Sequence, residues 1–200
     1  MTVWLVRHGR TQFNDERRYQ GRLDVPLSPA GAAELTAAGF APETVHVSPL
    51  CRAQQTADIV FPRARKKIVV PDFAEMDFGA FEGCTADEMA DDADYCAWVE
   101  SGATLPCPNG ESFAVFSERV CAAFERLIEE WQGKTLVIVA HGGTLCALMD
   151  RYALPERGYF DWMCPNGGGY RLDFDAALWR ARRRLRLVEP ISFARETGSC

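Results

Sequence analysis

Two apolar segments of this sequence end in the same pair of residues, a histidine followed by a glycine. The first segment, residues 3–7, leads into His8, and the second, residues 136–140, leads into His141. If the two segments are parallel neighbouring strands, they end at the same edge of the sheet, where α/β proteins bind ligands. The glycine after each histidine lets the backbone approach such a ligand closely. The pattern therefore predicts two imidazoles at one binding site.

Cationic groups accompany the two histidines. Arg7 directly precedes the first of them, and Arg52 lies in the first turn of a helix expected to begin at Ser48-Pro49. Gly142 opens a further helix, whose free N–H groups favour an anion. Because guanidinium forks match the oxygens of phosphate, this collection suits a phosphoryl dianion. A single histidine in a strand is usually structural, and we interpret His46 in that way.

Strands and helices are predicted to alternate along the chain, which indicates an α/β fold with a largely parallel sheet. Strands are expected at residues 3–6, 44–47, 67–70 and 135–140, and antiparallel strands near 170–174 and 178–188. Helices are expected at residues 28–38, 48–60, 92–100, 111–131 and 143–152, with a short helix at the capping-box residues 85–88. Residues 72–110 are poor in strand signal, so we expect a helical insertion within a single domain spanning residues 1–200.

Composition and charge exclude several classes of protein. The 200 residues carry 22 lysines and arginines against 28 aspartates and glutamates, which gives a net charge of −6 and disfavours binding of nucleic acid through overall charge. The longest apolar stretches are far shorter than the roughly 20 residues that span a bilayer. Without a signal-like start, the chain is expected to be cytoplasmic. Eight cysteines without C-x-x-C spacing, beside three histidines, indicate reduced thiols and no zinc site.

Four motifs in order resemble those of the histidine phosphatase superfamily, also called phosphoglycerate-mutase-like. They are residues 7–14 (RHGRTQFN), 48–57 (SPLCRAQQTA), 75–83 (EMDFGAFEG) and 141–142 (HG). The order and separations agree from residue 2 to about residue 175. The resemblance implies a three-layer α/β/α fold with a largely parallel central sheet and a small helical insertion over the site.

The resemblance also implies a mechanism that needs no metal or cofactor. His8 is the nucleophile and forms a phosphohistidine. Glu75 is the general acid and base, with Asp77 and Glu82 as rivals; we prefer a loop-holding role for Glu82. The phosphoryl oxygens are held by the remaining motif residues, namely Arg7, Arg52, Asn14, His141 and the Gly142 N–H.

Four further residues are candidate phosphate contacts. Gln20 and Gly21 lie where the first loop of the family touches phosphate, and Thr11 belongs to the first motif. Arg10 departs from the acidic or amide residue common at that place. It either adds positive charge at the mouth of the site or points into solvent.

The third motif favours a phosphatase over a mutase, because Met76 replaces an arginine by which mutases of the family recognise a phosphoglycerate. Tyr95, Trp98, residues 108–113 and Arg119 resemble the α-ribazole phosphatases of cobalamin synthesis. An aromatic insertion could stack on a benzimidazole ring, although these aromatic residues could also serve packing alone. We expect α-ribazole 5′-phosphate as substrate, with a broad-specificity sugar-phosphate or nucleotide phosphatase as the alternative.

Two other function classes are weighed against an enzyme. The arginines of residues 180–186 could form a nucleic-acid patch, but their alternation favours one face of a charged edge strand. A pseudoenzyme that only binds phosphorylated ligands is disfavoured, because all the expected catalytic residues are present. The expected partner is a small phosphorylated metabolite, with no nucleic acid and no membrane, and a homodimer is left open.

Overall fold

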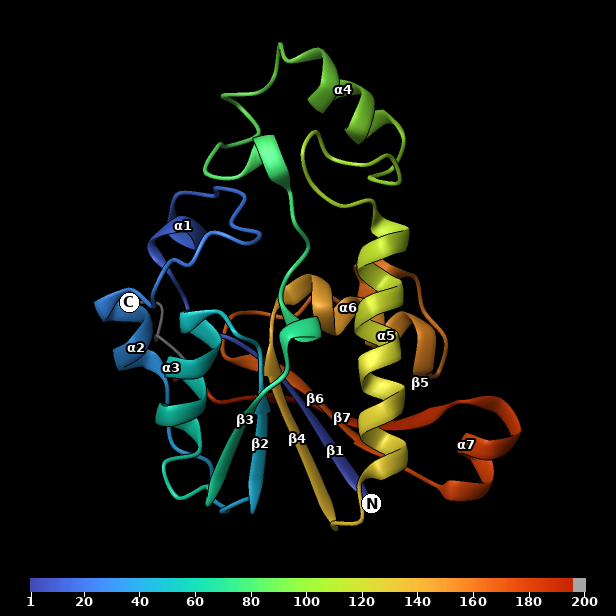
Figure 1. Cartoon of the computed structure of the whole chain (residues 1–200). Coiled ribbons are helices and arrows are strands. Elements are labelled where there is room, and N and C mark those ends of the chain that lie inside the picture. Colours follow the sequence, from blue (N-terminus) through green and yellow to red (C-terminus); the bar gives the residue numbers. More distant parts are fainter. Residues whose placement is uncertain (196–200) are drawn as a thin grey trace.

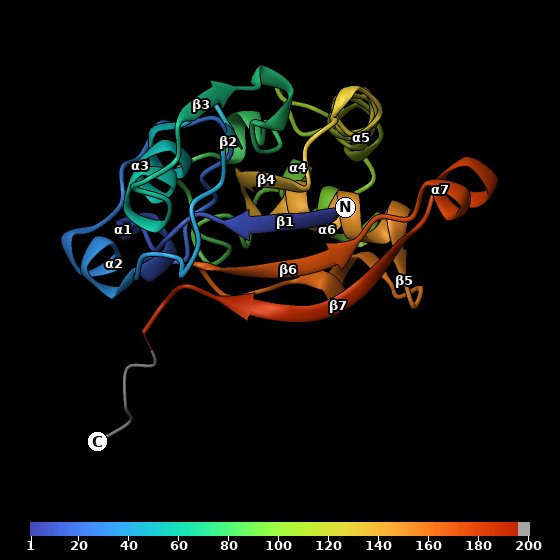
Figure 2. The ribbon, with the colours of Figure 1, turned by 90° about the horizontal axis from the view of Figure 1, so that it is seen from below.

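The computed structural model describes residues 1–195 and is built around a seven-stranded sheet (Figure 1). The strands are β1 Thr2–Arg7, β2 Thr44–Val47, β3 Lys66–Val69, β4 Thr135–Ala140, β5 Ala153–Leu154, β6 Gly168–Asp173 and β7 Leu185–Ser192. Their order is β3-β2-β4-β1-β6-β7-β5, and the pairs β3–β2, β2–β4 and β4–β1 are parallel. Strand β6 runs antiparallel to both of its neighbours, β1 and β7 (Figure 2). The predicted α/β fold is confirmed.

Helices alternate with the parallel strands. They are α1 Gln12–Asp15, α2 Pro29–Glu34, α3 Cys51–Val60, α4 Ala93–Glu100, α5 Phe113–Glu130, α6 Gly142–Tyr152 and α7 Ala176–Arg182, with short 3-10 turns η1 Pro71–Phe73, η2 Gly79–Phe81 and η3 Tyr159–Trp162. None of the helices within residues 1–195 combines the length and the apolar character that crossing a bilayer requires.

The alternation of side chains along β4 divides the core between two layers of helices. Leu136 and Ile138 pack with the apolar faces of α5 and α6, whereas Val137 and Val139 pack with α3 on the opposite side of the sheet. Figure 1 shows α3 and α5 on these two sides. Because each fully buried aliphatic side chain stabilises the fold by about 1.5–3 kcal/mol, the strand is held firmly from both sides. The sheet therefore gives a rigid support to the groups at its carboxyl edge.

The insertion expected at residues 72–110 forms a lid above the carboxyl ends of the strands (Figure 1). It contains η2 and α4, and the first turn of α4 is capped by the Asp92 side chain, which accepts a hydrogen bond from Tyr95 N. The inner side of the lid is held by edge-to-face aromatic contacts of Trp98 with Tyr19 and Phe78. The lid is thus packed against the loop that follows β1.

Two predicted helices have different bounds in the structure. The helix expected at residues 28–38 ends at Glu34, because the chain turns there to pair with the C-terminal segment: Leu35 bridges Ala194, and Thr36 N donates to Phe193 O. The helix expected from Ser48 begins at Cys51. Ser48 does not cap it, because its hydroxyl is used at the functional site described below.

One other predicted element is wrong, and a second is correct only in its C-terminal part. The short helix at residues 85–88 is a turn, although the side chains of Thr85 and Glu88 bond to each other's backbone N–H groups as a capping box does. The strand expected at residues 178–188 is instead α7, then a left-handed residue at Arg183, then β7. Burial of Trp179 and the Asp175 cap stabilise α7, so the arginines do not share one strand face.

Candidate active site

The two histidine tags lie side by side at the carboxyl edge of the sheet. Strands β1 and β4 pair in register with Arg7 opposite Ala140, and His8 N donates to Ala140 O at 2.9 Å. The ring centroids of His8 and His141 are therefore 5.2 Å apart. The spatial proximity predicted from the two tags is confirmed.

A cavity of about 490 Å³ opens between this edge and the lid. Most of the predicted site residues line it, namely Arg7, His8, Asn14, Gln20, Gly21, Arg52, Glu75 and Gly142. His141 is completely buried, with its ring beside that of His8. Two predicted residues, Arg10 and Thr11, do not line the cavity.

His8 is arranged as a neutral nucleophile. Its Nδ1 lies 2.7 Å from Gly9 O, and since a carbonyl oxygen only accepts, Nδ1 carries the proton. Nε2 is then the unprotonated nitrogen. Burial lowers the pKa of His8 well below its ordinary value, and the Arg52 and Arg7 guanidiniums lower it further. The ring thus keeps a lone pair for attack even in mildly acidic solution.

The two guanidiniums are held by backbone carbonyls and keep donors free. Arg52, which is 1% exposed, donates to Leu23 O and Gly21 O at 2.8 Å each, and Arg7 donates to Cys164 O. The Nε atoms of both arginines are buried without a hydrogen-bond partner in residues 1–195. Buried donors with no partner are costly, so this pair of N–H groups is suited to bind an anion.

Ser48 is a functional residue that sequence reasoning missed. Its hydroxyl lies 2.6 Å from His141 Nε2 and accepts a hydrogen bond from Leu50 N. This directs the hydroxyl proton towards Nε2 and favours the tautomer in which Nδ1 of His141 carries the proton. Nδ1 has no partner in the described part of the chain. The sequence pattern predicts only a helix cap for this serine, and the packing of β2 beside β4 reveals its contact.

Asn14 is oriented by a small network of polar side chains. Its Oδ1 accepts from Thr11 N at 3.0 Å and from Asn166 Nδ2 at 3.2 Å, which leaves the Asn14 amide N–H groups for the cavity. Thr11 is fully buried and caps α1, and its hydroxyl lies 2.9 Å from Gln20 Oε1. Thr11 therefore orients two lining residues rather than facing the cavity itself. Asn166 gave no signal in the sequence.

Arg10 points away from the cavity. Its guanidinium forms ion pairs with Asp15 at 3.0 Å and with Glu34. These carboxylates draw the side chain towards α1 and α2. The structure thus does not bring Arg10 to the other predicted phosphate contacts.

Glu75 places its carboxylate at the N-terminus of α6. Oε2 accepts from Gly143 N at 2.9 Å, and Oε1 accepts from Met76 N at 3.0 Å. The rival carboxylates are engaged elsewhere and do not line the cavity. Asp77 accepts from Gly79 N, while Glu82 accepts from the backbone N–H groups of Arg22, Leu23 and Phe78. Glu82 thus holds two loops together, as preferred from the sequence.

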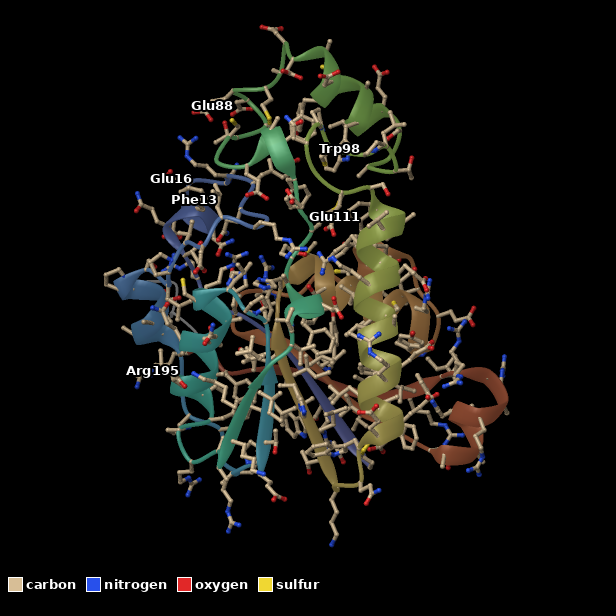
Figure 3. The ribbon with its side chains drawn as sticks, viewed as in Figure 1. Phe13, Glu16, Glu88, Trp98, Glu111 and Arg195 are labelled. Atoms are coloured by element: carbon tan, nitrogen blue, oxygen red, sulfur yellow. The ribbon has the colours of Figure 1, made fainter. Side chains whose placement is uncertain are left out.

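The outer wall of the cavity is aromatic and apolar. Tyr19, Phe78, Trp98, Phe113 and Tyr159 line it together with Met76 (Figure 3 shows Trp98 within the lid). The only further cation in the lining within residues 1–195, Arg18, is paired with Glu16 and Glu88, both labelled in Figure 3. Free positive charge is therefore confined to the floor around His8.

No three His, Cys, Asp or Glu side chains of residues 1–195 are grouped so as to hold a metal ion. The seven cysteines described are free thiols, and Cys200 lies outside the described residues. His46 lies in β2 with its ring edge-on to Trp131, outside the active-site cavity.

The floor of the cavity combines a neutral imidazole, two guanidiniums and one carboxylate, which is a set of groups suited to phosphoryl transfer.

Comparisons with known proteins agree with this chemistry. The model of the histidine phosphatase superfamily (branch 1) matches residues 3–185. The adenosylcobalamin/alpha-ribazole phosphatase of Escherichia coli is 34% identical over 159 residues, which cover 76% of this chain and 78% of that protein. Among solved structures, an alpha-ribazole phosphatase from Shigella flexneri has a TM-score of 0.83 at 27% identity over 100% of both chains. A phosphoglycerate mutase from Thermus thermophilus has a TM-score of 0.70 at 30% identity, covering 96% of this chain and 99% of that one.

Proposed function

The chain belongs to the histidine phosphatase superfamily, which supports phosphatase activity, and we propose that it hydrolyses phosphate monoesters through a phosphohistidine at His8. The observation that carries this proposal is the environment of one ring. Nδ1 of His8 is bonded to Gly9 O, which leaves Nε2 to attack. Beside it lie donors of Arg7, Arg52 and His141 that have no partner within residues 1–195.

In the first step, His8 Nε2 attacks phosphorus while the bond to the leaving oxygen breaks. Glu75, in its protonated form, transfers a proton to that oxygen, so the leaving group departs as a neutral alcohol. Arg7, Arg52 and the Nδ1–H of His141 hold the oxygens of the transferring group. In the phosphohistidine, the positive charge of the imidazolium ring is offset by the negative charge of the phosphoryl oxygens.

In the second step, water attacks the phosphohistidine in line. The Glu75 carboxylate accepts a proton from the water, the nitrogen–phosphorus bond breaks, and neutral His8 and phosphate are released. Each step inverts the configuration at phosphorus, so the complete reaction retains it. The two guanidiniums supply the positive charge that a metal ion supplies in other phosphatases, and the proposed activity is therefore metal-independent.

The proposed substrate is α-ribazole 5′-phosphate, because the cavity pairs one cationic floor with a wall of aromatic side chains. Aromatic pairs add about 0.5–1.5 kcal/mol beyond simple burial, which favours a leaving group with a ring such as benzimidazole. With Met76 in the lining and no unpaired lining cation beyond the floor in the described residues, a second anionic group on the substrate has no partner. This disfavours phosphoglycerates and mutase activity.

One observation favours the alternative of a broad-specificity sugar-phosphate or nucleotide phosphatase. Phe160 and Met163 line the mouth of the cavity and are 68% and 51% exposed. An apolar rim of this kind can accept leaving groups of different shapes. A comparison of substrates decides between the two candidates.

The test is a panel of kcat/KM values for α-ribazole 5′-phosphate, 3-phosphoglycerate and nucleoside 5′-monophosphates. The proposal predicts the highest value for α-ribazole 5′-phosphate, a loss of that preference in Trp98→Ala, and no turnover of any ester by a folded His8→Ala. Equal values across the panel support the broad-specificity phosphatase. A preference for 3-phosphoglycerate, or full activity of His8→Ala, contradicts the proposal.

A further inference from the structure

One largely shielded ion pair outside the cavity contacts the segment that carries Glu75. Arg119, in the second turn of α5, reaches the backbone of that segment with both of its terminal nitrogens. Nη1 donates to Asp72 O and Ala74 O, and Nη2 donates to Glu75 O, all at 2.8 Å. One guanidinium therefore fixes three carbonyls at and just before the proposed acid.

Glu111 holds this guanidinium and the other side of the segment. Its carboxylate pairs with Arg119 through two bonds, Nε to Oε1 at 2.7 Å and Nη2 to Oε2 at 2.8 Å. Oε2 also accepts from Asp77 N at 3.0 Å, and Glu111 N donates to Asp77 O. Figure 3 shows Glu111 where the lid joins the top of α5. The backbone is thus fixed on both sides of Glu75.

The pair is well enough shielded to act as a rigid clamp. Both side chains are 16% exposed, and the Arg119 guanidinium also lies over the Phe116 ring. Burial opposes ionisation of Glu111, but Arg119 and the Asp77 N–H hold its pKa below its ordinary value. Two charged groups joined by a bidentate contact keep a defined geometry, unlike an exposed ion pair.

The clamp also reaches the loop that holds Arg52. Glu111 Oε1 lies 3.5 Å from Arg22 Nη2, and Arg22 stands between Gly21 and Leu23, whose carbonyls accept from Arg52. Neither Glu111 nor Arg119 lines the cavity. Any effect of the pair on the reaction therefore passes through the residues that do.

We propose that Glu111 and Arg119 are positioning residues that hold the Glu75 carboxyl at the leaving-group oxygen. This rests on the proposed function, in which Glu75 is the general acid. A misplacement of about 1 Å can cost roughly 10²-fold in rate, and proton transfer contributes about 10²–10⁴-fold. The clamp should therefore matter most for leaving groups that require protonation.

The test compares two substrates in the full-length chain by kcat/KM, which reports the step that forms the phosphohistidine. p-Nitrophenolate is a stable anion and leaves without a proton, whereas an alkoxide needs one. In Arg119→Gln and Glu111→Gln, we expect kcat/KM for the best primary alkyl phosphate of the panel to fall about 10–10²-fold. For p-nitrophenyl phosphate we expect a fall of less than about threefold.

Two further variants serve as matched comparisons. Arg119→Lys keeps the charge without the fork, so it is expected to retain part of the lost activity. Arg126→Gln removes an exposed ion pair from the same helix to the Asp72 side chain, at 2.8 Å and with Arg126 61% exposed. For both substrates, kcat/KM of Arg126→Gln should stay within about twofold of that of the original chain, since most exposed ion pairs contribute little.

The outcomes separate this inference from the proposed function. The inference is overturned if kcat/KM falls equally for both substrates in Glu111→Gln, in Arg119→Lys and in any Arg119→Gln that folds. The ion pair would then be merely structural. Glu75→Gln is measured alongside. If it shows the loss confined to the alkyl phosphate and the clamp variants do not, the inference fails alone. If Glu75→Gln shows no such selectivity, the acid role of Glu75 fails first, and the inference with it.

Discussion

Replacing Gly143 by alanine should displace the proposed general acid without weakening the fold. A Cβ added at this position lies 2.5 Å from Glu75 Oε1 and 3.1 Å from Glu75 Cδ. The first distance is about 0.9 Å short of the 3.4 Å at which ordinary contact begins. The carboxylate must move by about that amount, and its hydrogen bond from Gly143 N is lost or lengthened.

The expected loss follows from this displacement. A shift of about 1 Å in a catalytic group costs roughly 10²-fold, so kcat/KM for an alkyl phosphate should fall about 10–10²-fold. Alanine favours a helix over glycine by about 0.5–1 kcal/mol, so the melting temperature should stay level or rise slightly. A loss of activity without a loss of stability is the signature of a displaced acid.

The assay measures kcat/KM for an alkyl phosphate and p-nitrophenyl phosphate, with a thermal melt for each variant. Gly39→Ala is the control, because a Cβ at Gly39 would have no atom of residues 1–195 within 4 Å. If Gly143→Ala keeps kcat/KM for the alkyl phosphate within twofold of the original chain, the position of the Glu75 carboxyl does not limit the reaction and the prediction fails. An equal fall for both esters would show that Glu75 does not act on the leaving group.

Three other predictions concern the floor of the cavity. Ser48→Ala leaves His141 Nε2 buried without its partner. The free energy of unfolding, measured by thermal unfolding, should therefore fall by about 1–3 kcal/mol, and kcat should fall as well. Burial is the main cause, and Arg52 the next, that lowers the pKa of both His8 and His141. As the pH falls below about 6.5, the two histidines are therefore protonated in the unfolded chain but not in the folded one. Denaturant titrations should therefore show stability that is complete above that pH and falls below it, by at most about 1.4 kcal/mol per pH unit for each histidine; a flat profile would contradict their burial as neutral rings. Exhaustive dialysis against a chelator should leave kcat/KM unchanged, and a loss restored by a divalent cation would contradict the metal-independent mechanism.

The sequence was sufficient for the parts of the fold that depend on local pattern. The apolar run of β4 was predicted with the correct bounds, because strand residues buried on both faces leave a continuous signal. Of the strand predicted at 178–188, residues 185–188 belong to β7, but residues 178–182 form a helix. Their alternating arginines and leucines resemble a strand, whereas burial of Trp179 and the Asp175 cap stabilise the helix. The cap is local, but Trp179 packs on Phe124 and Tyr152, which are distant in sequence, and no local pattern reports that contact.

The same distinction holds for the site. His8, Arg52 and His141 belong to motifs that can be identified in the sequence by their residue types and spacing. The parallel pairing of β1 with β4 brings the two histidines together. Ser48 and Asn166 were missed as site residues, because their contacts are made across 93 and 152 positions of chain. Arg10 stands in the first motif but is drawn away by carboxylates that the motif does not contain.

If the phosphoryl group is transferred to the imidazole of His8 before it reaches water, the stereochemical course at phosphorus records both displacements. A phosphate ester made chiral with oxygen isotopes is hydrolysed, and the configuration of the released phosphate is determined. Transfer to His8 followed by transfer to water predicts retention of configuration. Inversion would mean that water attacks the ester directly and that no phosphohistidine forms at His8.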